Sequence, residues 1–237
     1  MKALIVAAGY GSRLRSVSPS KPLTTVAGTP MIARVIAAAR AGGATGFVVV
    51  TGHEGDRLTA FLRDHDSTIT CVATPDWNLA NGHSVLTGAA VLGDAPHLLM
   101  MADHLFDPAI VAATIAAPRA ALTLAIDRRL DNPLVDLDDV TRVRTHGDRI
   151  VAIGKHLDDY DAFDCGVFAV NGRFHDALHA SITAGGVGSI SSGVETLAAM
   201  GDARVVDVGD AWWLDVDDPR ALAQAEVALA PLAAAVA

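Results

Sequence analysis

The front half of the chain alternates between short apolar runs and longer segments with helical spacing. Apolar runs of about four to eight residues, bounded by glycines or polar turns, are typical of buried strands. The predicted strands are 2–7, 47–50, 68–73 and 98–101, and the predicted helices are 31–40, 56–63 and 84–92. Strands and helices that alternate at this spacing predict right-handed βαβ units and a parallel sheet.

The pattern changes in the back half. Residues 141–151 alternate around His146, Gly147 and Asp148, which predicts an antiparallel hairpin. Further strands are expected at 121–126, 167–170 and 205–208, and helices at 194–200 and 219–229. No linker-like or repeated segment divides the chain. We therefore expect one α/β, Rossmann-like domain over 1–237, with a mixed, mostly parallel central sheet flanked by helices and a small antiparallel hairpin region.

Composition and charge restrict the partners. The 237 residues carry 18 basic and 27 acidic side chains, a formal net charge of −9, which disfavours nucleic acid and anionic membranes. Cys71 and Cys165 are far apart and do not suggest a disulfide framework, so a reducing compartment is expected. The apolar runs at the two ends are too short for a signal peptide or a membrane span. These features predict a cytoplasmic protein without membrane insertion.

A glycine-rich loop follows the first strand. Gly9 and Gly11 allow backbone amides to turn toward an anion. The dinucleotide-binding fingerprint needs a third glycine where Leu14 stands, and the Walker lysine pattern is absent, so both nucleotide-binding classes are disfavoured. Arg13, Arg15 and Lys21 place three cations in or beside the loop of an acidic protein. The pattern fits a polyphosphate-binding loop or a solvent-exposed basic loop.

Two segments, 8–14 (Ala-Gly-Tyr-Gly-Ser-Arg-Leu) and 20–23 (Ser-Lys-Pro-Leu), resemble the signature of the sugar nucleotidyltransferases. The resemblance implies that Arg13 and Lys21 are catalytic. Arg13 and the loop backbone would hold the β- and γ-phosphates of a nucleoside triphosphate, and Lys21 would contact the α-phosphate. The loop residues concerned are Ala8, Gly9, Gly11 and Ser12. The front half, about 1–118, would then bind the nucleotide, and the back half, about 119–237, the acceptor.

Carboxylates for a metal ion are also present. Asp103 follows the strand 98–101, at the sheet edge where parallel α/β folds bind ligands. Mg²⁺ prefers one or two carboxylates together with phosphate oxygens. Residues 212–217 resemble a late family segment that implies Asp215 as the second ligand, with Asp217 a further candidate. Transfer from a nucleoside triphosphate needs a divalent metal to neutralise phosphate charge, so Mg²⁺ is the expected cofactor. The histidines show no zinc-ligand spacing, and no zinc site is expected.

The family reads the nucleotide base near the start of a helix, which corresponds here to 78–84. Asn81, Gly82 and Ser84 are the expected contacts. Ser84 could equally be an ordinary helix N-cap.

Five further segments resemble the cytidylyltransferases that act on L-myo-inositol 1-phosphate. They are 101–104, 126–128, 151–155, 163–168 and 213–217. The resemblance implies that Lys155 binds the acceptor phosphate and that Asp164 binds ring hydroxyls of the polyol. His104, Arg128 and Gly166 would lie near the acceptor. Lys155 could instead be a solvated lysine at a hairpin end, and Asp164 a turn residue.

The sequence therefore predicts Mg²⁺-dependent transfer of a cytidylyl group from CTP to L-myo-inositol 1-phosphate. Relatives are often fused to a membrane phosphotransferase, so the product is expected to feed a separate one. Residues 130–140, with four aspartates, depart from the family pattern. Other acceptors therefore stay open: phosphocholine, a phosphonate, or a sugar 1-phosphate with UTP or dTTP as the nucleotide. The apolar stripes of the later helices suit a core or a homodimer contact. A non-catalytic nucleotide sensor is disfavoured because the cations and carboxylates are all present.

Overall fold

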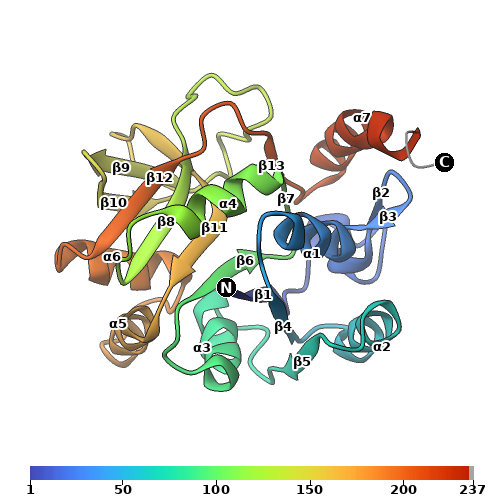
Figure 1. The fold of residues 1–237 in the computed structure, drawn as a ribbon, viewed down its shortest axis with the longest axis horizontal. Coiled ribbons are helices and arrows are strands. Elements are labelled where there is room, and N and C mark those ends of the chain that lie inside the picture. Colours follow the sequence, from blue (N-terminus) through green and yellow to red (C-terminus); the bar gives the residue numbers. More distant parts are fainter. Residues whose placement is uncertain (235–237) are drawn as a thin grey trace.

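A computed structural model describes residues 1–234 of the chain, with the side chains of 1–230 (Figure 1). Its centre is a nine-stranded sheet in the order β5-β4-β1-β6-β11-β8-β12-β10-β9. The strands are β1 (Lys2–Ala7), β4 (Gly46–Thr51), β5 (Thr70–Ala73), β6 (His97–Met101), β8 (Leu122–Asp127), β9 (Arg142–His146), β10 (Arg149–Gly154), β11 (Ala162–Val170) and β12 (Ala203–Asp207). Both halves of the chain thus contribute to one sheet.

The strand directions match the predicted change between the halves. Strands β5, β4, β1 and β6 are parallel neighbours, with Ile5 of β1 opposite Val49 and Met100. Strand β11 runs antiparallel between β6 and β8, while β12 is parallel to β8. Strands β9 and β10 form the hairpin predicted around His146–Asp148. The front half is therefore the predicted parallel sheet, and the back half is mixed.

Helices cover both faces of the sheet (Figure 1). On one face lie α1 (Met31–Ala41), α2 (Gly55–His65) and α4 (Pro108–Ala116), and on the other α3 (Asn81–Leu92), α5 (Gly172–Thr183) and α6 (Ile190–Ala199). Helix α7 (Pro219–Ala234) contacts the small hairpin of β2 (Thr25–Val26) and β3 (Thr29–Pro30). Among residues 1–234, no helix combines the length and the apolar character needed to span a bilayer.

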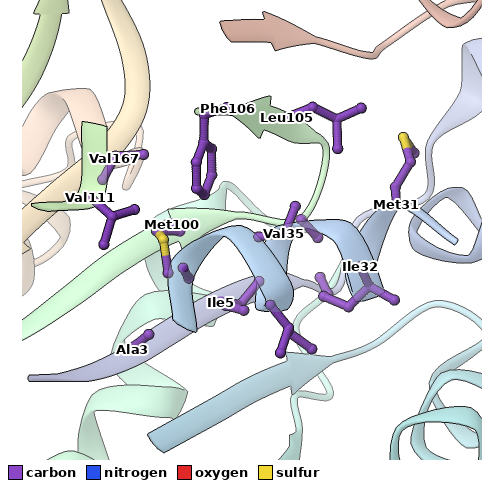
Figure 2. Packing of buried hydrophobic residues seen from close by; sticks show 14 of the residues in the cluster. Ala3, Ile5, Met31, Ile32, Val35, Met100, Leu105, Phe106, Val111 and Val167 are labelled. Atoms are coloured by element: carbon purple, nitrogen blue, oxygen red, sulfur yellow. The ribbon is translucent and has the colours of Figure 1, made fainter. Parts of the chain in front are cut away.

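The two faces arise from the alternation of buried side chains along each strand. In β1, Ile5 faces the core beneath α1 and Leu4 faces the core beneath α3, and both are fully buried. Helix α1 presents Met31, Ile32 and Val35 on one side, at the spacing of an amphipathic helix. Figure 2 shows these side chains gathered between α1 and the sheet. This packing holds the carboxyl ends of β1 and β6 side by side.

Three groups of α-helices and strands are absent from the predicted set. They are helices α4 and α5, the hairpin of β2 and β3, and the two-stranded sheet of β7 (His104–Phe106) and β13 (Trp213–Asp215). Strand β11 begins five residues before the predicted 167–170. Its register with β8 shifts between Asp164 and Phe168. That irregular stretch breaks the apolar pattern, and it carries residues of the candidate site.

Candidate functional site

The site lies where β1 and β6 end, as predicted for a parallel sheet. The glycine-rich loop follows β1, and Asp103 follows β6. The pairing of β13 with β7 places Asp215 opposite His104, which brings the late segment beside Asp103. Asp217 follows β13 and faces the glycine-rich loop through Arg13 and Lys21. Residues from the start, middle and end of the chain therefore meet at one sheet edge.

The predicted phosphate-binding cations are each paired with carboxylates. Lys21 Nζ donates to Asp103 Oδ2 at 2.6 Å and to Asp217 Oδ1. Arg13 Nη2 donates to Asp217 Oδ2 at 2.6 Å and to Asp139 Oδ2 at 2.6 Å. The result is an alternating row of cations and carboxylates across the site.

A cavity beside Lys21, here called the cradle, is lined by residues of the glycine-rich loop. Gly9, Gly11, Ser12 and Arg13 line it together with Lys21. Gly11 has φ of 62°, and a Cβ there would lie 2.5 Å from Cβ of Lys21, so only glycine fits. The predicted loop residues are thus brought together around one concave space. Ala8 is buried behind them, and its carbonyl accepts a hydrogen bond from His53 N at 2.9 Å.

His104 lies beside the two candidate metal ligands, Asp103 and Asp215. Its Nδ1 lies 2.9 Å from Asp103 Oδ1 and 3.6 Å from Asp215 Oδ1. Burial favours the neutral ring, but the carboxylates of Asp215 and Asp103 outweigh it and raise the pKa of His104 to about 9. Burial also opposes ionisation of Asp103, yet Lys21 and His104 hold the pKa of Asp103 well below its ordinary value. The ionised Asp103 carboxylate and the cationic Lys21 and His104 side chains therefore stabilise one another.

Asp103 and Asp215 fit a divalent cation that prefers oxygen ligands. Ligand atoms of Asp103, His104 and Asp215 lie within 4.8 Å of one another, and so do those of Asp139, Asp215 and Asp217. Asp215 Oδ1 is buried and has no hydrogen-bond partner in the described part of the chain. Burial raises the pKa of Asp215. A buried carboxylate oxygen without a partner is what a bound Mg²⁺ would satisfy.

A second cavity shares a wall with the cradle. Arg13, Asp103 and Asp217 line both cavities, whereas Lys155 and Asp164 line only the second. His104 and Gly166 also line the second cavity. The predicted donor and acceptor sides are therefore adjacent.

Asp164 and Gly166 form a turn at the floor of this second cavity. Gly166 N donates to Asp164 Oδ1 at 2.7 Å. Burial raises the pKa of Asp164 to about 6. Gly166 has φ of 73°, and a Cβ there would lie 2.2 Å from the His104 ring, so glycine is required. Asp164 thus makes the hydrogen bond of a turn residue, which was its alternative role, and it also lines the cavity.

The structure does not bring Arg128 into the second cavity. Its guanidinium donates to Asp161 Oδ2 at 2.6 Å and to Thr145 Oγ1 at 3.1 Å, and it lies 3.5 Å from Asp207 Oδ2. Arg128 does not line the cavity. Its position is set instead by carboxylates that lie far from it in the sequence, Asp161 before β11 and Asp207 at the end of β12.

The three predicted base contacts lie at the start of α3. Ala80 is the N-cap, so the alternative of Ser84 as N-cap is wrong, and Ser84 is buried within the helix. Asn81 Oδ1 accepts from Ile190 N at 2.9 Å, and Gly82 N donates to Gly188 O at 3.0 Å. The two residues therefore hold the 188–190 segment against α3. Base recognition by these residues stays a prediction.

Sequence reasoning missed two aspartates. Asp139 joins Arg13 to Lys155, which donates to Asp139 Oδ1. Lys155 and Arg13 hold the pKa of Asp139 below its ordinary value although burial opposes this. The fully buried Asp127 accepts from Arg129 N at 2.8 Å and from Trp213 Nε1 at 2.8 Å. Asp127 thereby anchors β13, which carries Asp215; an acidic residue ending an apolar strand was the available signal.

Comparisons with known proteins agree with this geometry. Residues 3–145 match the family model of the MobA-like NTP transferase domain. The chain is also 33% identical over 228 residues to the bifunctional IPC transferase and DIPP synthase of Rubrobacter xylanophilus, across 94% of this chain and 51% of that protein. The chain belongs to the MobA-like NTP transferase family. The nucleotidyltransferase family predicted from the two loop segments is thus confirmed.

Other members of this family are similar over most of the chain. The CMP-5'-(3-aminopropyl)phosphonate synthase of Streptomyces rubellomurinus is 32% identical over 257 residues, across 98% of this chain and 39% of that protein. This MobA-like chain thus spans about half, or less, of the length of these curated relatives. The inositol-1-phosphate CTP transferase from T. maritima has the same fold, with a TM-score of 0.85 at 24% identity, covering 93% of this chain and 90% of that one.

Proposed function

We propose that this MobA-like domain transfers a cytidylyl group from CTP to L-myo-inositol 1-phosphate and releases pyrophosphate. The observation that carries the proposal is the shared wall between the two cavities: Arg13 borders both the glycine-lined cradle and the space beside Lys155. A phosphate held at Lys155 would lie next to a nucleotide held in the cradle. The name of the Rubrobacter relative, an IPC transferase, supports the choice of acceptor.

The cradle would bind the nucleotide through charge and backbone amides. Arg13 and the amides of the loop would hold the β- and γ-phosphates, and Lys21 would contact the α-phosphate. Lys21 is paired with Asp103 and Asp217 in this structure, so a bound α-phosphate would share the lysine with these carboxylates or displace one of them. The same lysine would then stabilise the charge that develops on the α-phosphate.

Asp103 and Asp215 would hold Mg²⁺, with Asp217 beside them. The ion would neutralise charge on the phosphate oxygens. His104 would hold Asp103 in position through its 2.9 Å contact. The carboxylates would therefore hold the metal ion, whereas Arg13, Lys21 and Lys155 would contact the phosphates directly.

The acceptor phosphate needs little activation. Its oxygen is ionised near neutral pH, so positioning by Lys155 replaces a general base. That oxygen would form a bond to the α-phosphorus, while the bond from the α-phosphorus to the bridging oxygen breaks and pyrophosphate leaves with the electron pair. Asp164 and Gly166 would face the polyol hydroxyls from the floor of the cavity.

A phosphonate acceptor is the second candidate, because the Streptomyces relative is named as a synthase of a CMP-phosphonate. It would bind to the same cations and carboxylates, but different side chains would surround the rest of the acceptor. Residues 130–140 line part of the cavity and are the region most able to change acceptor choice.

The test is pyrophosphate release with Mg²⁺ and each nucleoside triphosphate in turn, against L-myo-inositol 1-phosphate, phosphocholine, 3-aminopropylphosphonate and glucose 1-phosphate. We expect turnover with CTP and inositol phosphate. Turnover with another pair would keep the nucleotidyl transfer and reject this acceptor. Nucleotide binding without turnover for any pair would reject the proposed reaction.

A further inference from the structure

Asp139 is one carboxylate shared by the two cations that border the acceptor cavity. Its Oδ2 accepts from Arg13 Nη2 at 2.6 Å, and its Oδ1 accepts from Lys155 Nζ. The Arg13 and Lys155 side chains are 47% and 50% exposed, and the Asp139 side chain is only 21% exposed. The carboxylate is therefore enclosed between two cations that solvent, or a ligand, can still reach.

The backbone around Asp139 presents this carboxylate to the cavity. Asp139 N and Val140 N both donate to Asp136 O, at 3.1 and 2.8 Å. Arg142 Nη2 donates to Leu137 O at 3.0 Å. Leu134 and Val135, at the start of the same segment, line the cavity as well and pack against the core. Because the segment is tied at both ends, Asp139 occupies a defined position.

Asp139 makes with Arg13 and Lys155 the same kind of contact that a phosphate would make. A carboxylate offers two oxygens to two cations, and a phosphate group that binds at either cation competes with one of these oxygens for the same positive charge. If phosphates bind at Arg13 and Lys155, as the proposed function requires, each arriving ligand weakens or displaces an ion pair that the protein already has. The ion pair then costs the ligand part of its binding free energy.

We propose that Asp139 is a built-in competitor of the substrate phosphates, which holds Arg13 and Lys155 in position and lowers the affinity of the resting site for phosphate anions. The inference rests on the proposed function only in taking these two residues as phosphate-binding. It differs from a metal-ligand or substrate-ligand role in the direction of its effect. Loss of a ligand weakens binding, whereas loss of a competitor strengthens it.

The experiment is calorimetric titration of the full chain with inorganic pyrophosphate and, separately, with L-myo-inositol 1-phosphate, in EDTA and low salt. In the Asp139→Asn variant we expect each dissociation constant to fall by about three- to tenfold, as for loss of a partly exposed ion pair. Asp138→Asn is the matched control, because Asp138 is exposed, lies in the same segment and carries the same charge. It should leave both constants unchanged.

Unchanged or weaker binding by Asp139→Asn, relative to Asp138→Asn, would overturn the inference. Asp139→Ala gives a second variant if the amide retains a contact with either cation. Arg13→Ala and Lys155→Ala separate this inference from the proposed function. If neither cation variant weakens binding of either anion, the phosphate-binding roles are wrong. If they do weaken it while Asp139→Asn does not strengthen it, only the competitor is rejected.

Discussion

Lys21 Nζ lies 2.6 Å from Oδ2 of Asp103, a residue 82 positions later in the chain. The loop after β1 and the turn after β6 are thus joined by an ion pair at the edge of the sheet. Lys21 also contacts Asp217 from the end of the chain. This lysine is therefore at the junction of the three segments that build the site.

Replacing Lys21 by Ala should slow turnover by about 10²–10³-fold, because one preorganised charge that stabilises the transition state is lost. Pyrophosphate release at saturating CTP, acceptor and Mg²⁺ measures the effect. The control is Lys2→Ala, at an exposed position at the start of β1. Near-normal turnover by a folded Lys21→Ala protein would reject the assigned role.

Replacing Asp103 or Asp215 by Asn should raise the Mg²⁺ concentration for half-maximal activity by about tenfold or more. Loss of even a residue that only hydrogen-bonds a metal ligand typically lowers metal affinity or activity by about tenfold or more, and loss of a ligand itself should have at least that effect. A Mg²⁺ titration of activity gives the value, and Asp131→Asn, on the exposed part of the 130–140 segment, is the control. An unchanged titration in both site variants would mean that the metal binds elsewhere.

Replacing Lys155 by Ala should raise the KM for the acceptor by about tenfold, and the KM for CTP much less, because one charge-assisted contact to the acceptor phosphate is lost. Arg128→Ala is the comparison, since Arg128 is paired with Asp161 outside the cavity. It should change neither KM. Equal increases for both substrates in Lys155→Ala would contradict the placement of this lysine.

Local sequence patterns predicted the parallel front half because β1, β4 and β6 are short, mostly apolar runs that are buried in the sheet. They failed where polar residues interrupt a strand: Asp164 and Gly166 lie inside β11, and their roles in the cavity require that irregularity. Helix α5 was missed although it begins at Gly172, directly after the capping Asn171.

The site divides in the same way. Arg13, Lys21, Asp103 and Asp215 lie in segments with a recognisable pattern, and they meet as expected. The pairing of Arg128 was not foreseen, because its partners Asp161 and Asp207 lie far from it in the sequence. Asp139 was missed for the same reason: the ion pair that makes it part of the site is formed with Arg13, 126 positions away. Long-range ion pairs leave no periodic signal in the sequence.

A buried histidine pair outside the site predicts acid sensitivity. The rings of His97 and His175 lie 5.0 Å apart between centroids, and burial, followed by repulsion from His97, lowers the pKa of His175 to about 4. The unfolded chain would have an ordinary pKa of about 6.5. Because the folded pKa is lower, the stability contribution of neutral His175 is present above pH 6.5 and is lost as the pH falls toward 4.

Urea unfolding at pH 7.5 and 4.5 tests this directly. We expect the wild-type protein to lose about 2–3 kcal/mol more unfolding free energy on acidification than His175→Gln loses. His179→Gln is the control, since His179 is exposed on the same helix. Identical acid sensitivity of the wild type and His175→Gln would show that His175 is protonated in the folded state at little cost.

The central claim is that the acceptor phosphate attacks the α-phosphorus of a nucleotide held by Arg13 and Lys21. The most direct measurement uses L-myo-inositol 1-phosphate with ¹⁸O in its phosphate group, CTP and Mg²⁺, with both products analysed by ³¹P NMR and mass spectrometry. We predict that all of the label stays in CDP-inositol, including the oxygen that bridges the two phosphorus atoms, and that pyrophosphate carries none. Label in the released pyrophosphate, or release of pyrophosphate without a labelled nucleotide product, would contradict the account.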